Sequence, residues 1–169
     1  MLFMFERYTE GARRVIFFAR FEASECGSSF IETEHLLLGV IREDKTFLSS
    51  LLSPEDRENI RAAVALRDKN SIKTSTSVDI PLSEECKQIL GNAAVQAEQR
   101  SDRHIGIEHL LLGLLSQKSF ASELLTQRGV TAEKVLQSLK KSPSAERPKT
   151  ERRKTSPPSS PPWAWPDAT

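Results

Sequence analysis

The sequence predicts an all-α protein in which a four-helix repeat occurs twice, giving about eight helices in a pseudo-two-fold duplication followed by a disordered proline-rich tail. The first observation is that residues 34–39, Glu-His-Leu-Leu-Leu-Gly, occur again letter for letter at 108–113. The second is that the same 74-residue offset holds upstream without a gap and pairs Ile31 with Ile105. A register kept over about 35 residues indicates an internal duplication. The third is the helical spacing of apolar residues in both copies.

The repeated motif predicts a short helix that is enclosed on nearly every side. Thr33 can cap the first copy through its hydroxyl, and Glu34 then lies in the first turn, where the helix dipole favours an anion. The leucines that follow are apolar all round the helix, which is typical of a buried helix and not of an amphipathic surface helix. Gly39 and Gly113 each cost about 1 kcal/mol against alanine in a helix interior. Their presence in both copies predicts that another helix crosses there at close range.

The first repeat is predicted to span residues 9–66 and to contain four helices. Thr9 caps the first helix and Gly27 ends it, with apolar residues at i, i+3, i+4 and i+7 between them. The enclosed helix follows, and a short helix around Phe47 comes next. Ser53 and the proline after it then start the fourth helix, because an N-cap before a proline is a typical helix start.

Residues 67–82 are polar, lack a helical period and are predicted to be a linker between the repeats. The second repeat, 83–141, opens with a helix capped by Ser83 and then contains the second enclosed helix. A short helix from Phe120 and a last helix capped by Thr131 complete the repeat.

The composition changes abruptly after the predicted domain, residues 1–141. Residues 142–169 hold seven of the nine prolines among Ser, Lys, Arg and Glu. Such a segment buries too little apolar surface to offset its ordering entropy, so we predict a disordered tail. Trp163 and Trp165 in this tail would suit a short linear motif that binds a partner. An unconstrained end of the chain explains the same residues without a function.

Charge and motif content exclude several classes of function. The net charge of +1 gives no strong electrostatic attraction to nucleic acid or to an anionic membrane, and no run approaches the roughly 18 apolar residues of a spanning helix. Phosphate-binding, dinucleotide-binding, nucleophile-elbow and zinc-protease motifs are missing from the sequence. Cys26 and Cys86 form no disulfide framework, and neither has the surroundings of a nucleophile. We therefore expect a cytoplasmic monomer with no cofactor and no nucleic-acid or membrane partner.

Three histidines, His35, His104 and His109, leave a small metal-dependent hydrolase as one alternative. If the repeats face each other, His35 and His109 together with Glu34 and Glu108 are conceivable ligands. Adjacent residues on a helix point about 100° apart, however, so a Glu and the His after it do not readily bind one ion together. A buried histidine that is hydrogen-bonded to the backbone is the simpler interpretation, and we predict no metal.

Residues 4–12, Met-Phe-Glu-Arg-Tyr-Thr-Glu-Gly-Ala, together with the paired motifs and the 74-residue duplication, resemble the Clp amino-terminal (Clp repeat) domain, most closely that of the ClpC type. The resemblance covers about residues 4–141 and implies an all-helical pseudo-two-fold bundle of two four-helix repeats. It also implies a non-catalytic module that recognises proteins in Clp quality control. The chain ends without either ATPase ring, so it is similar to a stand-alone Clp repeat protein or to a truncated unfoldase.

In the ClpC family this domain binds adaptors and substrates marked by phosphorylated arginine. The resemblance implies that the guanidinium-binding carboxylates are Glu34 and Glu108, with Thr9 and Ser83 beside them. A carboxylate holds a guanidinium through two parallel hydrogen bonds, and helix N-termini offer N–H groups to a phosphate. Glu32 stands where the family has glycine, and its charge opposes a phosphate.

Two other interpretations of these residues stay open. Acids such as Glu34 and Glu108 stabilise the first turn of their own helices without any ligand. A regulatory accessory protein that binds a Clp unfoldase, or competes with it for adaptors, would have the same features. The partners expected are a Clp adaptor, a substrate protein or a Clp ATPase.

Overall fold

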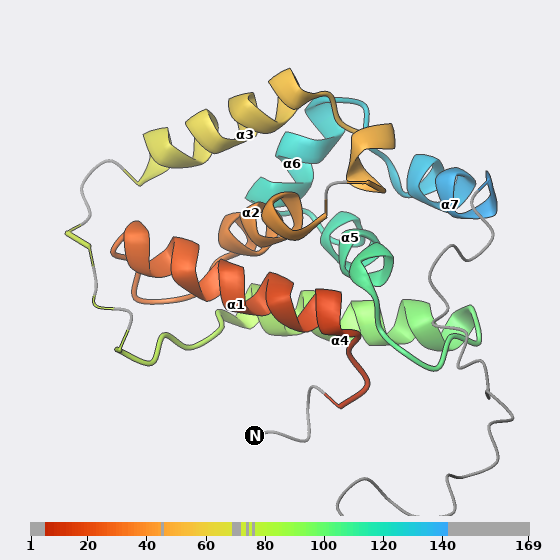
Figure 1. Ribbon diagram of the computed structural model, residues 1–169, viewed down its shortest axis with the longest axis horizontal. Helices are drawn as coiled ribbons and strands as arrows, with labels where there is room; N and C mark the ends of the chain where they lie inside the picture. The colour runs from red at the N-terminus through yellow and green to blue at the C-terminus, as the bar shows by residue number, and fades with distance from the viewer. Residues whose placement is uncertain (1–5, 45, 69–71, 74, 76, 142–169) are drawn as a thin grey trace, which may run out of the picture.

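The computed structural model describes residues 6–44, 46–68, 72–73, 75 and 77–141. Within these residues the protein is all-helical, which confirms the predicted fold class (Figure 1). The helices, in chain order, are α1 Glu10–Glu25, α2 Thr33–Glu43, the 3-10 helix η2 Leu48–Ser50, α3 Pro54–Arg67, α4 Glu84–Gln99, α5 Ile107–Leu115, α6 Phe120–Gln127 and α7 Ala132–Lys141. None of the helices in this part of the chain is both long enough and apolar enough to cross a bilayer.

The two helices of the repeated motif, α2 and α5, form the centre of the bundle. Figure 1 shows them between α1 and α4 on one side and α3 and α6 on the other. Every residue of α2 from Thr33 to Ile41 is buried, and so is every residue of α5 from His109 to Leu114. The prediction of an enclosed helix in each copy is therefore confirmed.

Two glycines allow neighbouring helices to approach these central helices closely. A Cβ at Gly39 would collide with the carbonyl oxygen of Val15 in α1, and a Cβ at Gly113 would lie 2.6 Å from the carbonyl oxygen of Ile89 in α4. Real Cβ atoms do not come this close to a carbonyl oxygen, so only glycine fits at either crossing. The predicted close crossing is present in both repeats.

Capping residues explain where most helices begin. The hydroxyls of Thr9, Ser53 and Ser83 accept hydrogen bonds from the N–H groups of Ala12, Asp56 and Cys86, and Gly27 ends α1 with a φ of 64°. The prediction for Thr33 was wrong in detail, because Thr33 is the first residue of α2 and Glu32 is its N-cap. The N–H of Glu32 donates to Nδ1 of His35 at 3.0 Å, so a histidine three residues further on completes the cap.

The short helix predicted around Phe47 is a single 3-10 turn and not an α-helix. The carboxylate of Asp44 accepts the N–H groups of Phe47 and Leu48, each at 3.0 Å. Ser53, in extended backbone, and Pro54 then start α3. The 3-10 helix η2 has three residues, whereas its counterpart α6 has eight.

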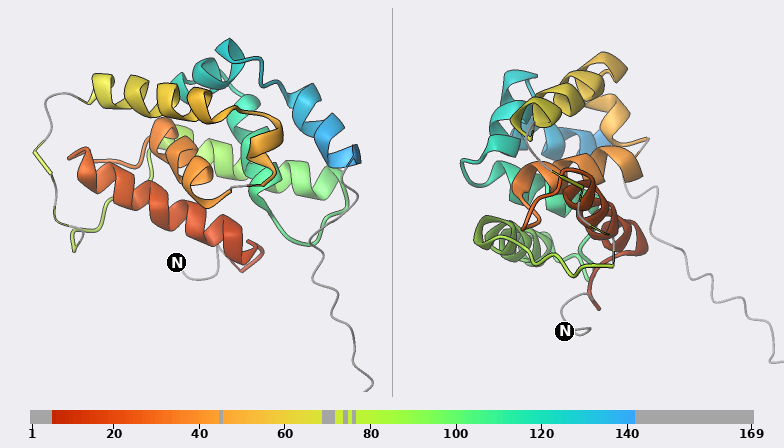
Figure 2. Two further views of the ribbon diagram at one scale, coloured as in Figure 1. Left: turned by 45° about the horizontal axis from the view of Figure 1, so that its top comes forward. Right: turned by 90° about the vertical axis from the view of Figure 1, so that its left-hand side faces the viewer.

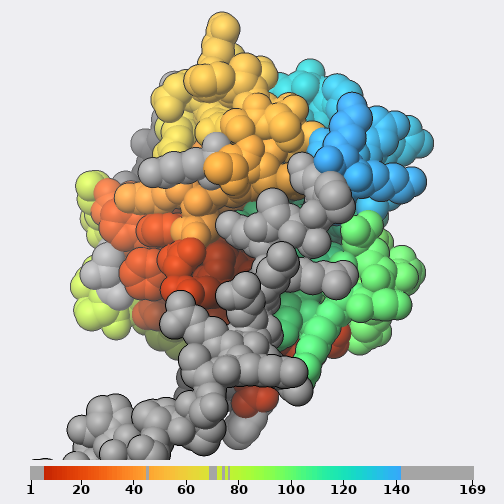
Figure 3. Space-filling model, turned by 45° about the vertical axis from the view of Figure 1, so that its right-hand side comes forward, coloured from red at the N-terminus to blue at the C-terminus, as the bar shows by residue number. Residues whose placement is uncertain are grey.

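The beginnings of the two repeats are joined crosswise through two isolated parallel β-bridges, Tyr8 with Ile105 and Ile31 with Leu82. One bridge brings the N-terminus of α1 beside the N-terminus of α5, and the other brings α4 beside α2. Each half of the bundle thus contributes one helix N-terminus to the other half (Figure 2). A second junction lies on the surface, where the stretch leading into α3 borders α7 (Figure 3).

The domain boundaries drawn from the sequence stay predictions. Helix α3 ends at Arg67, which is the first residue of the predicted linker, 67–82. The predicted tail, residues 142–169 with both tryptophans, lies outside the described residues.

Candidate ligand-binding sites

The crosswise bridges create two corresponding groups of residues at the tips of α2 and α5, each with one acidic side chain. The first site comprises Glu32, Thr33, Glu34 and Ser83, and the second site comprises Gly106, Ile107, Glu108 and Thr9. In the first site, the N–H of Ser83 donates to the carbonyl oxygen of Ile31 at 3.0 Å. In the second, the N–H of Thr9 donates to the carbonyl oxygen of Ile105 at 3.0 Å. Each acidic tip therefore lies beside the helix N-terminus of the opposite repeat.

The second site is open to solvent. The side chain of Glu108 is 36% exposed, and Oε1 lies 3.6 Å from Nδ1 of its neighbour His109. Its carboxylate folds back over Gly106, where a Cβ would lie only 2.5 Å from Oε2. Ile107 packs against the position of a Cβ on Gly11, in the first turn of α1, at 3.3 Å. The result is a reachable carboxylate with an apolar wall and the N-terminus of α1 next to it.

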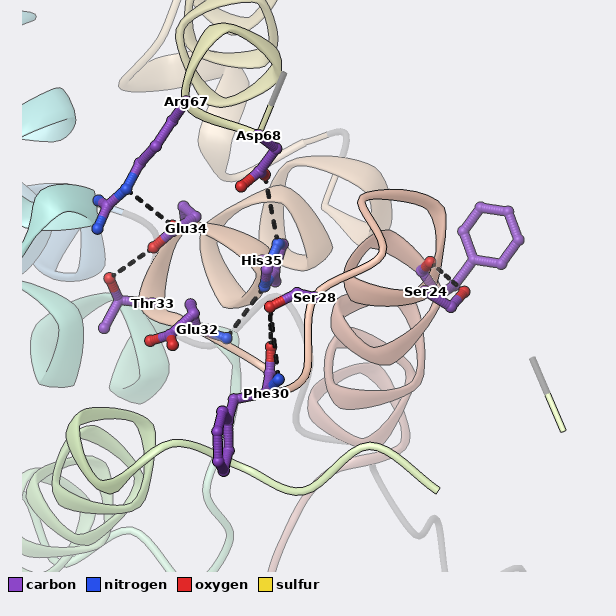
Figure 4. A network of polar contacts seen from close by, with 10 residues as sticks. Ser24, Ser28, Phe30, Glu32, Thr33, Glu34, His35, Arg67 and Asp68 are labelled. Carbon is purple, nitrogen blue, oxygen red and sulfur yellow. Dashed lines mark hydrogen bonds and ion pairs between the residues drawn. The ribbon is translucent and has the colours of Figure 1, made fainter. Parts of the chain in front are cut away.

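The first site is closed by the chain itself. The side chain of Glu34 is only 4% exposed, and Oε1 lies 3.5 Å from Nε of Arg67 at the end of α3. Oε2 accepts a hydrogen bond from the hydroxyl of Thr33 at 3.3 Å. Figure 4 shows Arg67 reaching across the tip of α2 toward Glu34. The same guanidinium lies over the ring of Phe120 in α6, with 4.5 Å to the ring centroid.

The buried histidines complete the helix caps. Both His35 and His109 are 1% exposed, and Nδ1 of each accepts a backbone N–H, from Glu32 at 3.0 Å and from Gly106 at 2.9 Å. A neutral imidazole whose Nδ1 accepts a hydrogen bond carries its proton on Nε2. In the second repeat, Nε2 of His109 lies 3.0 Å from the Asp102 carboxylate, which is the acceptor that this tautomer requires.

The structure brings together a group of possible metal ligands that differs from the group considered from the sequence. Cys26, His35 and Asp68 offer ligand atoms within 4.8 Å of one another, and they are the one such group of three found among the described residues. The donors do not fit a metal ion, since Nε2 of His35 carries the imidazole proton. Burial, followed by a hydrogen bond to Asp68, raises the pKa of the Cys26 thiol to about 12. The thiolate that a metal prefers is thus strongly disfavoured.

Cys86 is equally unsuited to nucleophilic chemistry. It is fully buried in the first turns of α4, and burial raises the pKa of its thiol to about 12, with the charges of Glu32 and Glu34 acting in the same direction. Both thiols therefore remain protonated at neutral pH.

Sequence reasoning identified the two acidic tips but missed Arg67 and Phe120. Arg67 was assigned to the linker and Phe120 to the start of a short helix in the other repeat. Their contact joins residues from opposite repeats, which one sequence does not reveal. The available signal was only a basic residue at the end of a predicted helix, which is common near helix C-termini.

The fold and these tips define the class of the protein as an all-helical tandem-repeat domain whose polar groups gather at two helix N-termini. The chain belongs to the Clp repeat N-terminal domain family, because the model of that family, described as Clp repeat (R) N-terminal domain, matches residues 6–54 and 81–163.

Relatives and solved structures agree with this assignment. The chloroplastic chaperone protein ClpC1 of Oryza sativa subsp. japonica is 36% identical over 129 residues, which are 75% of this chain but 14% of that protein. The ATP-binding subunit ClpA homolog of the ATP-dependent Clp protease of Guillardia theta is 36% identical over 116 residues, or 68% of this chain and 14% of that protein. The chain thus spans a small part of these relatives.

The N-terminal domain of the caseinolytic protease associated chaperone ClpD from Arabidopsis thaliana superposes with a TM-score of 0.62 at 26% identity, covering 80% of this chain and 96% of that domain. The Hsp104 N-terminal domain from Candida albicans, with a TM-score of 0.64 at 20% identity over 79% of this chain and 90% of that domain, shares the fold.

Proposed function

We propose that this domain is a non-catalytic recognition module that binds adaptors or arginine-phosphorylated substrate proteins of the Clp system, and that the second site makes the contact. The observation that carries the proposal is the half-buried carboxylate of Glu108, reachable from solvent beside the N-terminus of α1. A bidentate carboxylate–guanidinium pair gives both energy and orientation.

The N-terminus of α1 supplies the phosphate-binding half of the proposed second site. The first N–H groups of a helix lack acceptors within the helix, and the helix dipole favours an anion there. The hydroxyl of Thr9 already accepts from Ala12 at 3.2 Å, so it shapes the helix start, and the N–H groups that precede Ala12 in α1 would bind a phosphate. A ligand that carries a guanidinium and a phosphate together would bind to Glu108 and to α1 at once.

Calorimetric titration with phospho-L-arginine tests this proposal. Wild type should give a saturable heat, and Glu108→Gln, which keeps the shape of the side chain and removes its charge, should abolish it. Glu55→Gln is the matched control, because Glu55 is an exposed first-turn acid of α3, at the end of that helix opposite Arg67. Equal binding by wild type and Glu108→Gln, or absence of binding by wild type, contradicts the proposal.

A regulatory accessory role is the second candidate, and an exposed aromatic favours it. Phe17 on α1 is 66% exposed, and its ring meets that of Phe18 edge to face at 5.8 Å between centroids. Its counterpart in the second repeat is Gly91. An accessory protein of this kind would compete with a full-length Clp unfoldase for adaptors. A competition pull-down with wild type and Phe17→Ala tests it, and unchanged competition by the variant removes this support.

The cytoplasmic location and the monomeric state stay predictions. Sedimentation velocity across a range of concentrations tests the second, and a concentration-dependent sedimentation coefficient would contradict it.

A further inference from the structure

The two acidic tips are related by the duplication and yet differ in access. The side chain of Glu34 is 4% exposed, whereas that of Glu108 is 36% exposed. The difference has an identifiable cause, because Arg67 covers Glu34 and the described residues show no arginine paired with Glu108.

The length of α3 brings Arg67 to the first site. Helix α3 has 14 residues, and Arg67 is the last of them. A helix advances 1.5 Å per residue, so Arg67 lies about 20 Å along the axis from the start of α3.

The contacts of Arg67 are those by which a protein binds an arginine ligand. Nε lies 3.5 Å from the carboxylate of Glu34, and the guanidinium lies over the ring of Phe120 at 4.5 Å. A carboxylate beside a guanidinium and an aromatic ring under its face are the two standard partners of this group. The first site thus already contains a guanidinium, supplied by the chain.

We propose that Arg67 is an autoinhibitory occupant of the first site, which excludes guanidinium ligands from Glu34 and leaves the second site as the working site of the domain. A tethered group competes at an effective concentration on the order of millimolar or more, which free ligands rarely match. The side chain of Arg67 is itself 52% exposed, so it can swing away without unfolding the bundle. The proposal rests on the proposed function in one respect, namely that the tips bind guanidinium ligands.

A rescue experiment tests the proposal. Glu108→Gln should bind no phospho-L-arginine, because the second site has lost its charge and the first is closed. The double variant Arg67→Ala/Glu108→Gln should regain one bound ligand, with amide shifts at Thr33 and Glu34 in NMR spectra. Arg61→Ala/Glu108→Gln is the matched control, since Arg61 lies on the same helix and pairs with Glu58, at 3.9 Å, instead of with Glu34. The control should bind nothing.

The contrary outcomes are distinct. If Glu108→Gln alone binds a ligand at Glu34, the first site is open and the autoinhibition is overturned, whereas binding of phospho-L-arginine by the domain survives and its assignment to the second site alone does not. If Arg67→Ala/Glu108→Gln is folded and binds nothing, the autoinhibition is likewise overturned. Should that variant unfold, Arg67→Gln/Glu108→Gln, which keeps part of the stem over Phe120 and removes the charge, replaces it under the same criteria.

Chemical rescue separates the occupancy of the first site from the phosphoarginine proposal. Ethylguanidinium should fill the vacated position in Arg67→Ala, restore its melting temperature and shift Phe120, whereas ethylammonium should not. Arg67→Ala/Glu34→Gln should show no rescue. Rescue by ethylguanidinium together with no phospho-L-arginine binding by any variant would support the guanidinium site and overturn the proposed ligand. Absence of rescue overturns the inference.

Discussion

The N–H of Thr9 donates to the carbonyl oxygen of Ile105 at 3.0 Å and thereby fixes the start of the first repeat to the acidic tip of the second. The matching bond from Ser83 to Ile31, also 3.0 Å, fixes the second repeat to the first. Both candidate sites are therefore built from two repeats, and neither would exist in an isolated half. The bridges that close the bundle are the same contacts that assemble the sites.

The close crossings of the central helices predict that glycine-to-alanine substitutions lower stability at Gly39 and Gly113 but raise it at Gly91. Gly39→Ala and Gly113→Ala should each destabilise the protein by about 1–3 kcal/mol, because the added methyl collides with the backbone of α1 or α4. Gly91→Ala, at an exposed position in α4 with no atom near its Cβ, should stabilise by about 1 kcal/mol. Urea unfolding measures all three, and destabilisation by Gly91→Ala of the same size as the others would contradict the packing argument.

The buried cap of α5 predicts which substitutions of His109 are tolerated. His109→Leu should cost about 1–3 kcal/mol, because it leaves the buried N–H of Gly106 without its acceptor. His109→Gln should recover part of this loss, since glutamine three residues after an N-cap can accept the same N–H. Equal stability of the leucine and glutamine variants, measured by thermal and urea unfolding, would show that the hydrogen bond contributes nothing.

The buried thiol of Cys86 predicts a loss of stability in alkali. Its pKa is raised from 9.0 to about 12 in the folded protein, so the unfolded chain loses this proton first and stability falls as the pH rises from about 9 toward 12. The free energy of unfolding of wild type should fall relative to that of Cys86→Ala by about 1.4 kcal/mol per pH unit in this window. Urea titrations of both proteins at several pH values measure the difference. Below about pH 8 the difference should be constant, because the thiol keeps its proton in both the folded and the unfolded state. A constant difference above pH 9 would contradict the raised pKa.

The tautomer of His35 predicts that zinc does not bind to the cluster of Cys26, His35 and Asp68. With Nδ1 accepting the N–H of Glu32, the proton lies on Nε2 and no ring lone pair is available to a metal ion. Amide NMR spectra should stay unchanged around His35 at one equivalent of Zn²⁺. A Zn²⁺ complex that disappears in Cys26→Ser would show that the cap opens to release the ring nitrogen.

The sequence by itself determined the twofold plan, the helix starts at Thr9, Ser53 and Ser83, and the buried central helices with their glycines. Capping residues and apolar periodicity are local signals in the sequence, and both repeats contain them. The cap of α2 at Glu32 was not predicted, because a histidine completes it and threonine is a preferred N-cap residue, which favoured Thr33.

Tertiary structure alone decided that the two tips differ. Glu34 and Glu108 stand in the same hexapeptide, yet Arg67 and Phe120, from opposite repeats, meet over the first tip and not over the second. Access to a carboxylate depends on which distant side chains fold over it, and an ion pair between elements far apart in sequence leaves no periodic trace along the chain. The chemistry of each tip was therefore readable from the sequence, and its availability to a ligand required the packed bundle.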